Sequence, residues 1–171
     1  MALHSVEQLG HKIPDETRTR AAKYVELASQ GALKSLGSYT PGIAPTQSMT
    51  GELLFSRILL GQKLTAEQEK EASAFLIQTL PAAEGAADFY GWYYVSLALD
   101  QLQNDEWKKW NTAMRDSLIK RQTKGGAGDG CWEGTITWME HGGKIYTTSM
   151  GALTLEVYYR YLNLLDTSKS E

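Results

Sequence analysis

The sequence predicts an all-α fold of about six helices, arranged as about three helical hairpins. Apolar residues recur at spacings of three and four along most of the chain, which is typical of amphipathic helices. Proline, glycine and helix-capping residues separate these segments. Similar short apolar groups also return at intervals of roughly 40–50 residues, the period of helical-hairpin arrays. The β-rich patch at residues 135–138 is too short and isolated to form the basis of a sheet.

The first predicted hairpin consists of two helices, over residues 14–36 and about 48–60. Pro14 and the two acidic residues that follow it are suited to a first helical turn. Gly37 is expected to end the first helix and Gly61 the second. A loop of turn-forming residues, 38–45, connects them.

The second predicted hairpin begins with a capping box. Thr65, followed three residues later by Gln68, favours the start of a helix, which Pro81 stops after residue 80. The next helix, about residues 88–102, is apolar on nearly all sides and is therefore expected to be buried on several sides.

The two helices of the third predicted hairpin are separated by a glycine-rich loop. Asn104 or Asp105 caps a helix that ends near residue 122, and a last helix covers residues 146–165. The expected organisation is a lead-in at 1–13, one helical domain at 14–165 and a polar tail at 166–171.

The two helices of a hairpin differ in character. One is apolar on most sides and the other is amphipathic, with charges along one face. This asymmetry predicts an inner and an outer layer of helices. A bundle of six unrelated helices is the alternative.

Composition excludes several classes of function. The formal net charge of −3 gives no electrostatic reason to expect a nucleic-acid partner. Since no run of 18 apolar residues exists, no transmembrane span is expected. The first residues lack the features of a signal peptide, so we expect a soluble chain, although the true N-terminus lies elsewhere if the chain is a piece of a longer protein.

Four residues around the glycine-rich loop resemble a known repeat. Leu118, Gln122, Gly130 and Trp132 are similar to the QW repeat of squalene–hopene cyclases, oxidosqualene cyclases and their protein-prenyltransferase relatives. The glutamine amide can bind backbone groups near the next helix, and the tryptophan can cover the end of a hairpin. This copy has Ser117 where the family has an aromatic residue, and a longer gap between the glutamine and the glycine.

Further stretches resemble bacterial squalene-cyclase-like or prenyltransferase-like proteins, and together the resemblance covers about residues 40–165. They are residues 49–61, 90–94, 107–111 and 155–161. The resemblance implies an α/α toroid, in which outer helices surround inner ones. A full toroid has about twice the helices counted here, so the chain is expected to be an arc or a portion of one. An open arc needs a partner to cover its inner face.

The residues that perform cyclase chemistry are missing from the matching place. The family's proton-donating aspartate lies at the start of an inner helix, where this chain has Ser48, and Met49 replaces the cysteine beside it. Since a serine hydroxyl is not a strong acid, cyclase activity is expected to be lost. Glu52 is a candidate general acid if it is buried, or a carboxylate that favours the helix dipole.

The glycine-rich loop also resembles a catalytic zinc or phosphate site. Asp129 and Cys131 have the spacing of two prenyltransferase zinc ligands, but the family's histidine falls where this chain has Thr147 or Thr148. His141 lies in a loop only ten residues after Cys131. A metal is therefore disfavoured. Residues 125–128 lack the phosphate-binding P-loop pattern, and no cofactor is expected.

These observations favour a non-catalytic squalene-cyclase-like module for interaction or ligand binding, within a larger bacterial protein. Its expected partners are another part of the parent protein, a protein that covers the inner face, or a hydrophobic small molecule. One alternative is a toroid enzyme acting on polyprenyl or carbohydrate substrates, and another is a lipid or isoprenoid carrier. The candidate cavity residues are Trp92, Tyr93 and Tyr146, and the candidate catalytic residues are Glu52, Asp88, Asp129, Glu133 and Glu140.

Overall fold

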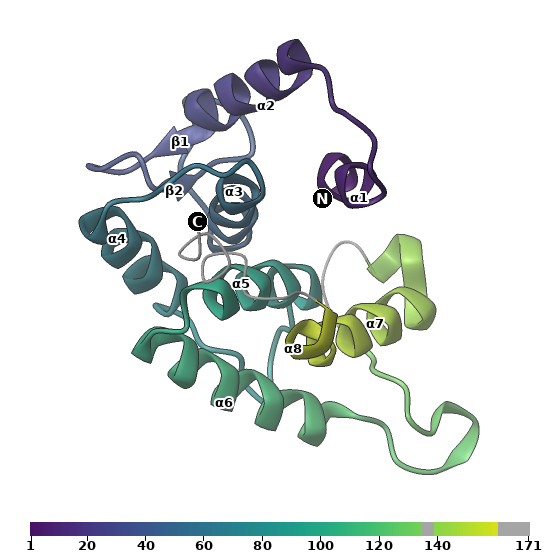
Figure 1. Ribbon diagram of the computed structural model, residues 1–171. Coiled ribbons are helices and arrows are strands. Elements are labelled where there is room, and N and C mark those ends of the chain that lie inside the picture. The colour runs from purple at the N-terminus through teal and green to yellow at the C-terminus, as the bar shows by residue number, and fades with distance from the viewer. Residues whose placement is uncertain (135–138, 161–171) are drawn as a thin grey trace.

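A computed structural model describes residues 1–134 and 139–160, and in this part of the chain the fold is all-α (Figure 1). Its helices are α1 (Ala2–Gln8), α2 (Asp15–Ala28), α3 (Gln47–Leu59), α4 (Ala66–Leu76), α5 (Phe89–Leu102), α6 (Asp105–Arg121), α7 (Met139–Leu155) and α8 (Val157–Arg160). Two strands of two residues each, β1 (Ser29–Gln30) and β2 (Leu36–Gly37), pair antiparallel. The predicted fold class is confirmed.

The helices form the hairpins α2–α3, α4–α5 and α6–α7. Helix α5 packs mainly against α3 and α7, while α2 and α4 pack on α3 and α6 packs on α5. Figure 1 shows α2, α4 and α6 along the outside of α3 and α5. The inner layer is therefore α3, α5 and α7, and the N-terminal residues of these three helices lie at the same end of it.

Helix α5 is the centre of the hydrophobic core. Most of its residues are buried, as its apolar character on all sides predicts. Gly51 of α3 allows the close packing, because a Cβ at this position would lie 2.9 Å from the backbone carbon of Tyr94. On the other side, the buried indole of Trp110 donates to Ser96 Oγ at 2.9 Å. These contacts fix α5 between α3 and the outer helix α6.

The first predicted helix, residues 14–36, is too long. Helix α2 ends at Ala28, and the β1–β2 turn follows it. Side chains distant in sequence hold this turn: Glu71 accepts hydrogen bonds from the Leu33 and Ser35 amides, and Arg57 donates to the Lys34 carbonyl. These tertiary contacts outweigh the helical periodicity of the segment.

Other boundaries also differ from the prediction. The expected lead-in contains α1, and α4 ends at Leu76 instead of residue 80. Helix α7 begins at Met139, with a break in helical geometry at Gly143, instead of beginning at Tyr146. The capping box of Thr65 and Gln68 is confirmed, and Asn104 caps α6.

Some predictions fall on other parts of the chain. Residues 135–138, the last part of the predicted helix at 161–165 and the tail at 166–171 lie outside the described residues. Within residues 1–134 and 139–160, no helix combines the length and the apolar character needed to cross a membrane.

Candidate functional site

The structure brings the four residues of the QW-like segment together at the end of α6. The indole Nε1 of Trp132 donates to the Leu118 carbonyl at 2.8 Å, and the side-chain amide Nε2 of Gln122 donates to the Gly130 carbonyl at 3.0 Å. Gln122 and Trp132 also form an antiparallel bridge. Trp132 therefore covers the C-terminal end of α6.

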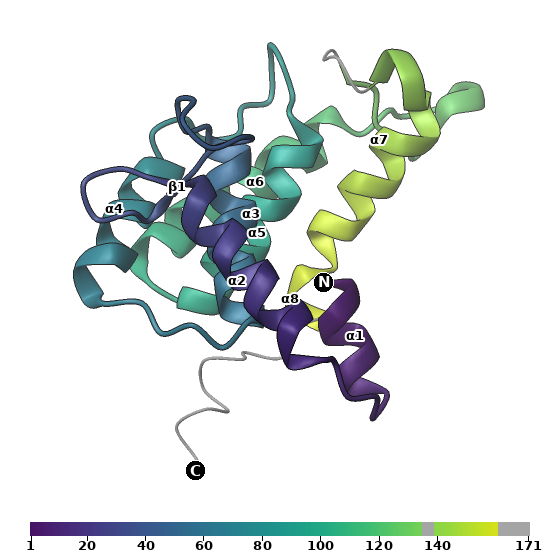
Figure 2. The same ribbon diagram turned by 90° about the horizontal axis from the view of Figure 1, so that it is seen from above.

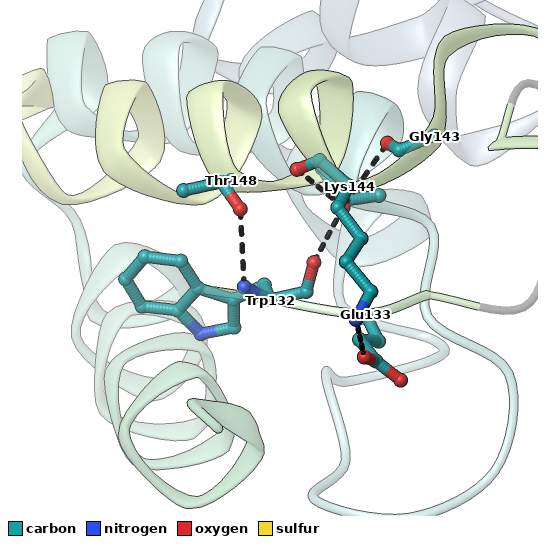
Figure 3. A network of polar contacts seen from close by, with 6 residues as sticks. Trp132, Glu133, Gly143, Lys144 and Thr148 are labelled. Carbon is teal, nitrogen blue, oxygen red and sulfur yellow. Dashed lines mark hydrogen bonds and ion pairs between the residues drawn. The ribbon is translucent and has the colours of Figure 1, made fainter. Parts of the chain in front are cut away.

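Trp132 also attaches the loop to α7, as Figure 3 shows. Its amide donates to Thr148 Oγ1 at 3.2 Å, and its carbonyl accepts from Thr147 Oγ1 at 2.5 Å. Gly151 leaves room for the indole, since a Cβ there would lie 3.0 Å from the ring. Glu133 forms an ion pair with Lys144 on the surface. This segment positions the inner helix α7.

The candidate metal ligands Asp129 and Cys131 do not form part of a metal-binding cluster among the described residues. Asp129 accepts a hydrogen bond from the Gly125 amide at 2.7 Å and so closes the glycine-rich turn. Cys131 is partly exposed. In the described part of the chain, no cluster of three or more His, Cys, Asp or Glu side chains could hold a metal ion. The candidate Glu140 has a side chain outside the described residues.

An open cleft of about 720 Å³ lies at the N-terminal ends of the three inner helices. Its surface is mostly apolar. In Figure 2 the N-terminal half of α7 stands apart from α3. The residues that line it come from the α2–α3 connection, from the N-terminal ends of α3 and α5 and from the N-terminal half of α7: Tyr39, Thr46, Ser48, Met49, Asp88, Tyr90, His141, Gly142 and Tyr146.

A hydrogen-bonded pair, Ser48 and Asp88, joins two of these helix ends. The Ser48 hydroxyl donates to Asp88 Oδ2 at 2.7 Å. Asp88 is the N-cap of α5, and its Oδ1 accepts from the Gly91 amide at 2.8 Å. Position 91 has to be glycine, because a Cβ there would lie 2.4 Å from both Ser48 Oγ and Asp88 Oδ2. The serine that replaces the expected acid thus binds a carboxylate from the neighbouring helix.

A second carboxylate, Glu52, lies one turn further along α3. It accepts a hydrogen bond from the Tyr90 hydroxyl. Burial raises the pKa of Glu52, although the hydrogen bond from Tyr90 opposes this, and burial together with Glu52 raises the pKa of Tyr90. Glu52 lines an adjoining cleft of about 430 Å³, which shares Tyr39 and Met49 with the first. The two carboxylates thus line adjoining clefts.

The three predicted cavity residues have different positions. Trp92 and Tyr93 are buried in the hydrophobic core, and Trp92 packs beneath the Arg121 guanidinium. Neither lines either cleft, whereas Tyr146 does. Sequence reasoning missed Tyr39, which lies in a loop without any periodic pattern. An aspartate three residues before Gly91 at the start of an apolar segment is the sequence signal from which Asp88 could have been predicted as the N-cap of α5.

Comparison of the chain with protein-family models, with curated proteins and with solved structures finds no match.

Proposed function

We propose that this chain is a non-catalytic ligand-binding module with a squalene-cyclase-like α/α architecture, an arc of a toroid within a larger bacterial protein. The observation that carries the proposal is the cleft of about 720 Å³ at the N-terminal ends of α3, α5 and α7. Its size falls in the range of small-molecule sites, and its lining combines apolar surface with a few polar groups.

The polar groups of the cleft support binding over catalysis. Cyclase chemistry needs a strong acid at the start of α3, and Ser48 donates its proton to a hydrogen bond with Asp88. Asp88 in turn caps α5. Both side chains therefore have structural partners, and neither is a strong acid facing a substrate.

The proposal is tested with a neutral fluorophore, phenylnaphthylamine, whose emission rises in apolar surroundings. We expect one saturable site. Met49→Asp places a charge in the apolar lining and is expected to weaken binding about tenfold or more, since desolvating a carboxylate beside an apolar ligand is unfavourable. The matched control is Ile145→Asp on α7, where the side chain is 83% exposed and does not line the cleft.

Equal binding by both variants and by the unmodified chain would place the fluorophore elsewhere, such as the cavity of about 360 Å³ between α1, α2 and α3. That result, or the absence of a saturable site, contradicts the proposal.

A second candidate function, a toroid enzyme, is favoured by the raised pKa of Glu52. Such an enzyme would use Glu52 as a general acid. Incubation with polyprenyl substrates, followed by mass spectrometry, should then yield a product that disappears in Glu52→Gln. No product at all favours the binding module, whereas a product that persists in Glu52→Gln would show that Glu52 is not the general acid.

A further inference from the structure

The cleft at the inner-helix ends carries a negative charge. Among the described residues that line it, Asp88 is the carboxylate and His141 the imidazole, and none is a lysine or an arginine. Glu52 places a second carboxylate in the adjoining cleft. The nearby Lys144 is held by its ion pair with Glu133. A ligand that brings a positive charge would therefore complement the cleft.

Helix N-termini favour anions, but in this cleft the protein supplies the anion itself. The Gly91 amide at the start of α5 donates to Asp88, and the Met49 amide at the start of α3 donates to Thr46. The Asp88 carboxylate thus occupies the place that a bound anion would take. It accepts one hydrogen bond at each oxygen, from Gly91 and Ser48, and a carboxylate has about four acceptor sites. The Asp88 carboxylate can therefore accept a further hydrogen bond from a ligand.

Three tyrosine rings supply a surface suited to an organic cation. Tyr39, Tyr90 and Tyr146 all line the cleft, together with the thioether of Met49. The Tyr90 ring is held against Tyr94, with 4.8 Å between the centroids. Burial and, after it, the charge of Asp88 raise the pKa of Tyr146. Aromatic faces attract ammonium ions, and they also pack against the apolar groups that such ions carry.

We propose that the cleft binds an organic ammonium ion with apolar substituents, with Asp88 facing its charge and Tyr39, Tyr90 and Tyr146 facing its carbon groups. This inference rests on the proposed ligand-binding function and adds the chemical class of the ligand. The volume of about 720 Å³ leaves room for a hydrocarbon substituent beside the ammonium group.

The test uses three probes that share one chain and differ in charge: octyltrimethylammonium, octanol and octyl sulfate, all below their micelle concentrations. Dissociation constants are measured by calorimetry at pH 8, where imidazoles are ordinarily neutral. We expect the cation to bind about tenfold or more tightly than octanol, and octyl sulfate to bind most weakly.

Asp88→Asn removes the charge and keeps the cap, because asparagine is an equally good N-cap residue. In this variant the preference for the cation over octanol should fall to about twofold or less. The matched control, Asp116→Asn, makes the same change on the exposed face of the outer helix α6 and should keep the full preference. Circular dichroism verifies that both variants fold.

A second pair of variants tests the aromatic surface. Tyr146→Phe keeps the ring and should retain the preference for the cation, whereas Tyr146→Leu should reduce it several-fold while changing octanol binding less.

The outcomes separate the two proposals. If octanol binds at the cleft as tightly as the cation, or if Asp88→Asn leaves the preference intact, the ammonium inference is wrong and the ligand-binding module stands. If octyl sulfate binds most tightly of the three probes, the ammonium inference is likewise wrong and the ligand-binding module stands. If none of the three probes binds, the proposed function itself is contradicted.

Discussion

Two connections lead from an outer helix to the next inner helix by the same backbone arrangement. Residues 29–46 join α2 to α3, and residues 122–138 join α6 to α7, of which 122–134 are described. Each contains an antiparallel pairing, between β1 and β2 in the first and between Gln122 and Trp132 in the second. In each, a backbone amide then donates to a threonine of the inner helix: Gly37 to Thr50 at 2.9 Å, and Trp132 to Thr148 at 3.2 Å.

The two connections differ in what stabilises them. The first is held by Arg57 and Glu71, which belong to α3 and α4. The second is held by its own residues, Gln122 and Trp132. A repeated backbone arrangement can therefore be stabilised by distant charges or by local aromatic and amide groups. Only stabilisation by residues within the connection itself produces a motif that can be recognised in the sequence.

The largest effect is expected from removing the aromatic support of the second connection. Trp132 is buried between the end of α6 and Gly151 of α7, so Trp132→Ala creates a cavity and loses a hydrogen bond. We expect the free energy of unfolding to fall by about 3–5 kcal/mol. Urea denaturation measures it, and a loss below about 1 kcal/mol would contradict the role of this side chain.

The corresponding change in the first connection is Glu71→Ala. It leaves the amide and hydroxyl of the buried Ser35 without their acceptor, while water can replace Glu71 at the exposed Leu33 amide, and we expect a loss of about 1–3 kcal/mol. Hydrogen exchange should show faster exchange at residues 29–37 and unchanged exchange at residues 122–134. Equal acceleration in both connections would show that they are not stabilised independently.

A matched pair of threonine variants compares the two attachments directly. Thr50 is fully buried, so Thr50→Val leaves the Gly37 amide unpaired and should cost about 1–3 kcal/mol. Thr148 is only partly buried, and water can replace it, so Thr148→Val should cost less than about 1 kcal/mol. The difference is measured by thermal and urea denaturation, and the reverse order would contradict the comparison.

The smallest effect concerns pH. Burial raises the pKa of Glu71, but hydrogen bonds from Ser35, Leu33 and Ala32 outweigh this, so its pKa lies below the ordinary value of 4.5. A carboxyl group whose pKa is lower in the folded than in the unfolded state stabilises the protein at pH values above its unfolded-state pKa. This contribution is lost as the pH falls through the folded-state pKa. Protection from exchange, relative to the intrinsic rate at each pH, should therefore fall more at residues 29–37 than at residues 122–134 below pH 4.5. The same loss of protection in Glu71→Gln would show that another group is responsible.

Much of the fold was predictable because its signals are local. The cap at Thr65, the all-round apolar character of α5 and the alternation of inner and outer helices follow from residues close in sequence. The turn at residues 29–37 was predicted as helix, since its stabilising partners lie on α3 and α4 and leave no trace in the segment itself.

The candidate site was predictable only in outline. The sequence directed attention to the inner-helix N-termini and to Ser48, and Tyr146 was expected to line a cavity. The pairing of Ser48 with Asp88 across two helices depends on their packing, which spacing along the chain does not reveal. Trp92 and Tyr93 could not be distinguished from cleft residues by type, because aromatic side chains occur both in cores and in binding sites.

Methyl NMR of the methionines tests the claim that the cleft at the ends of α3, α5 and α7 is a binding site. Met49 lines the cleft, while Met114 is fully buried in the core. On titration with phenylpropanol, whose ring shifts nearby methyl signals, we expect a saturable shift of the Met49 signal and no change at Met114. An unchanged Met49 signal, or equal shifts of both signals, would contradict the claim.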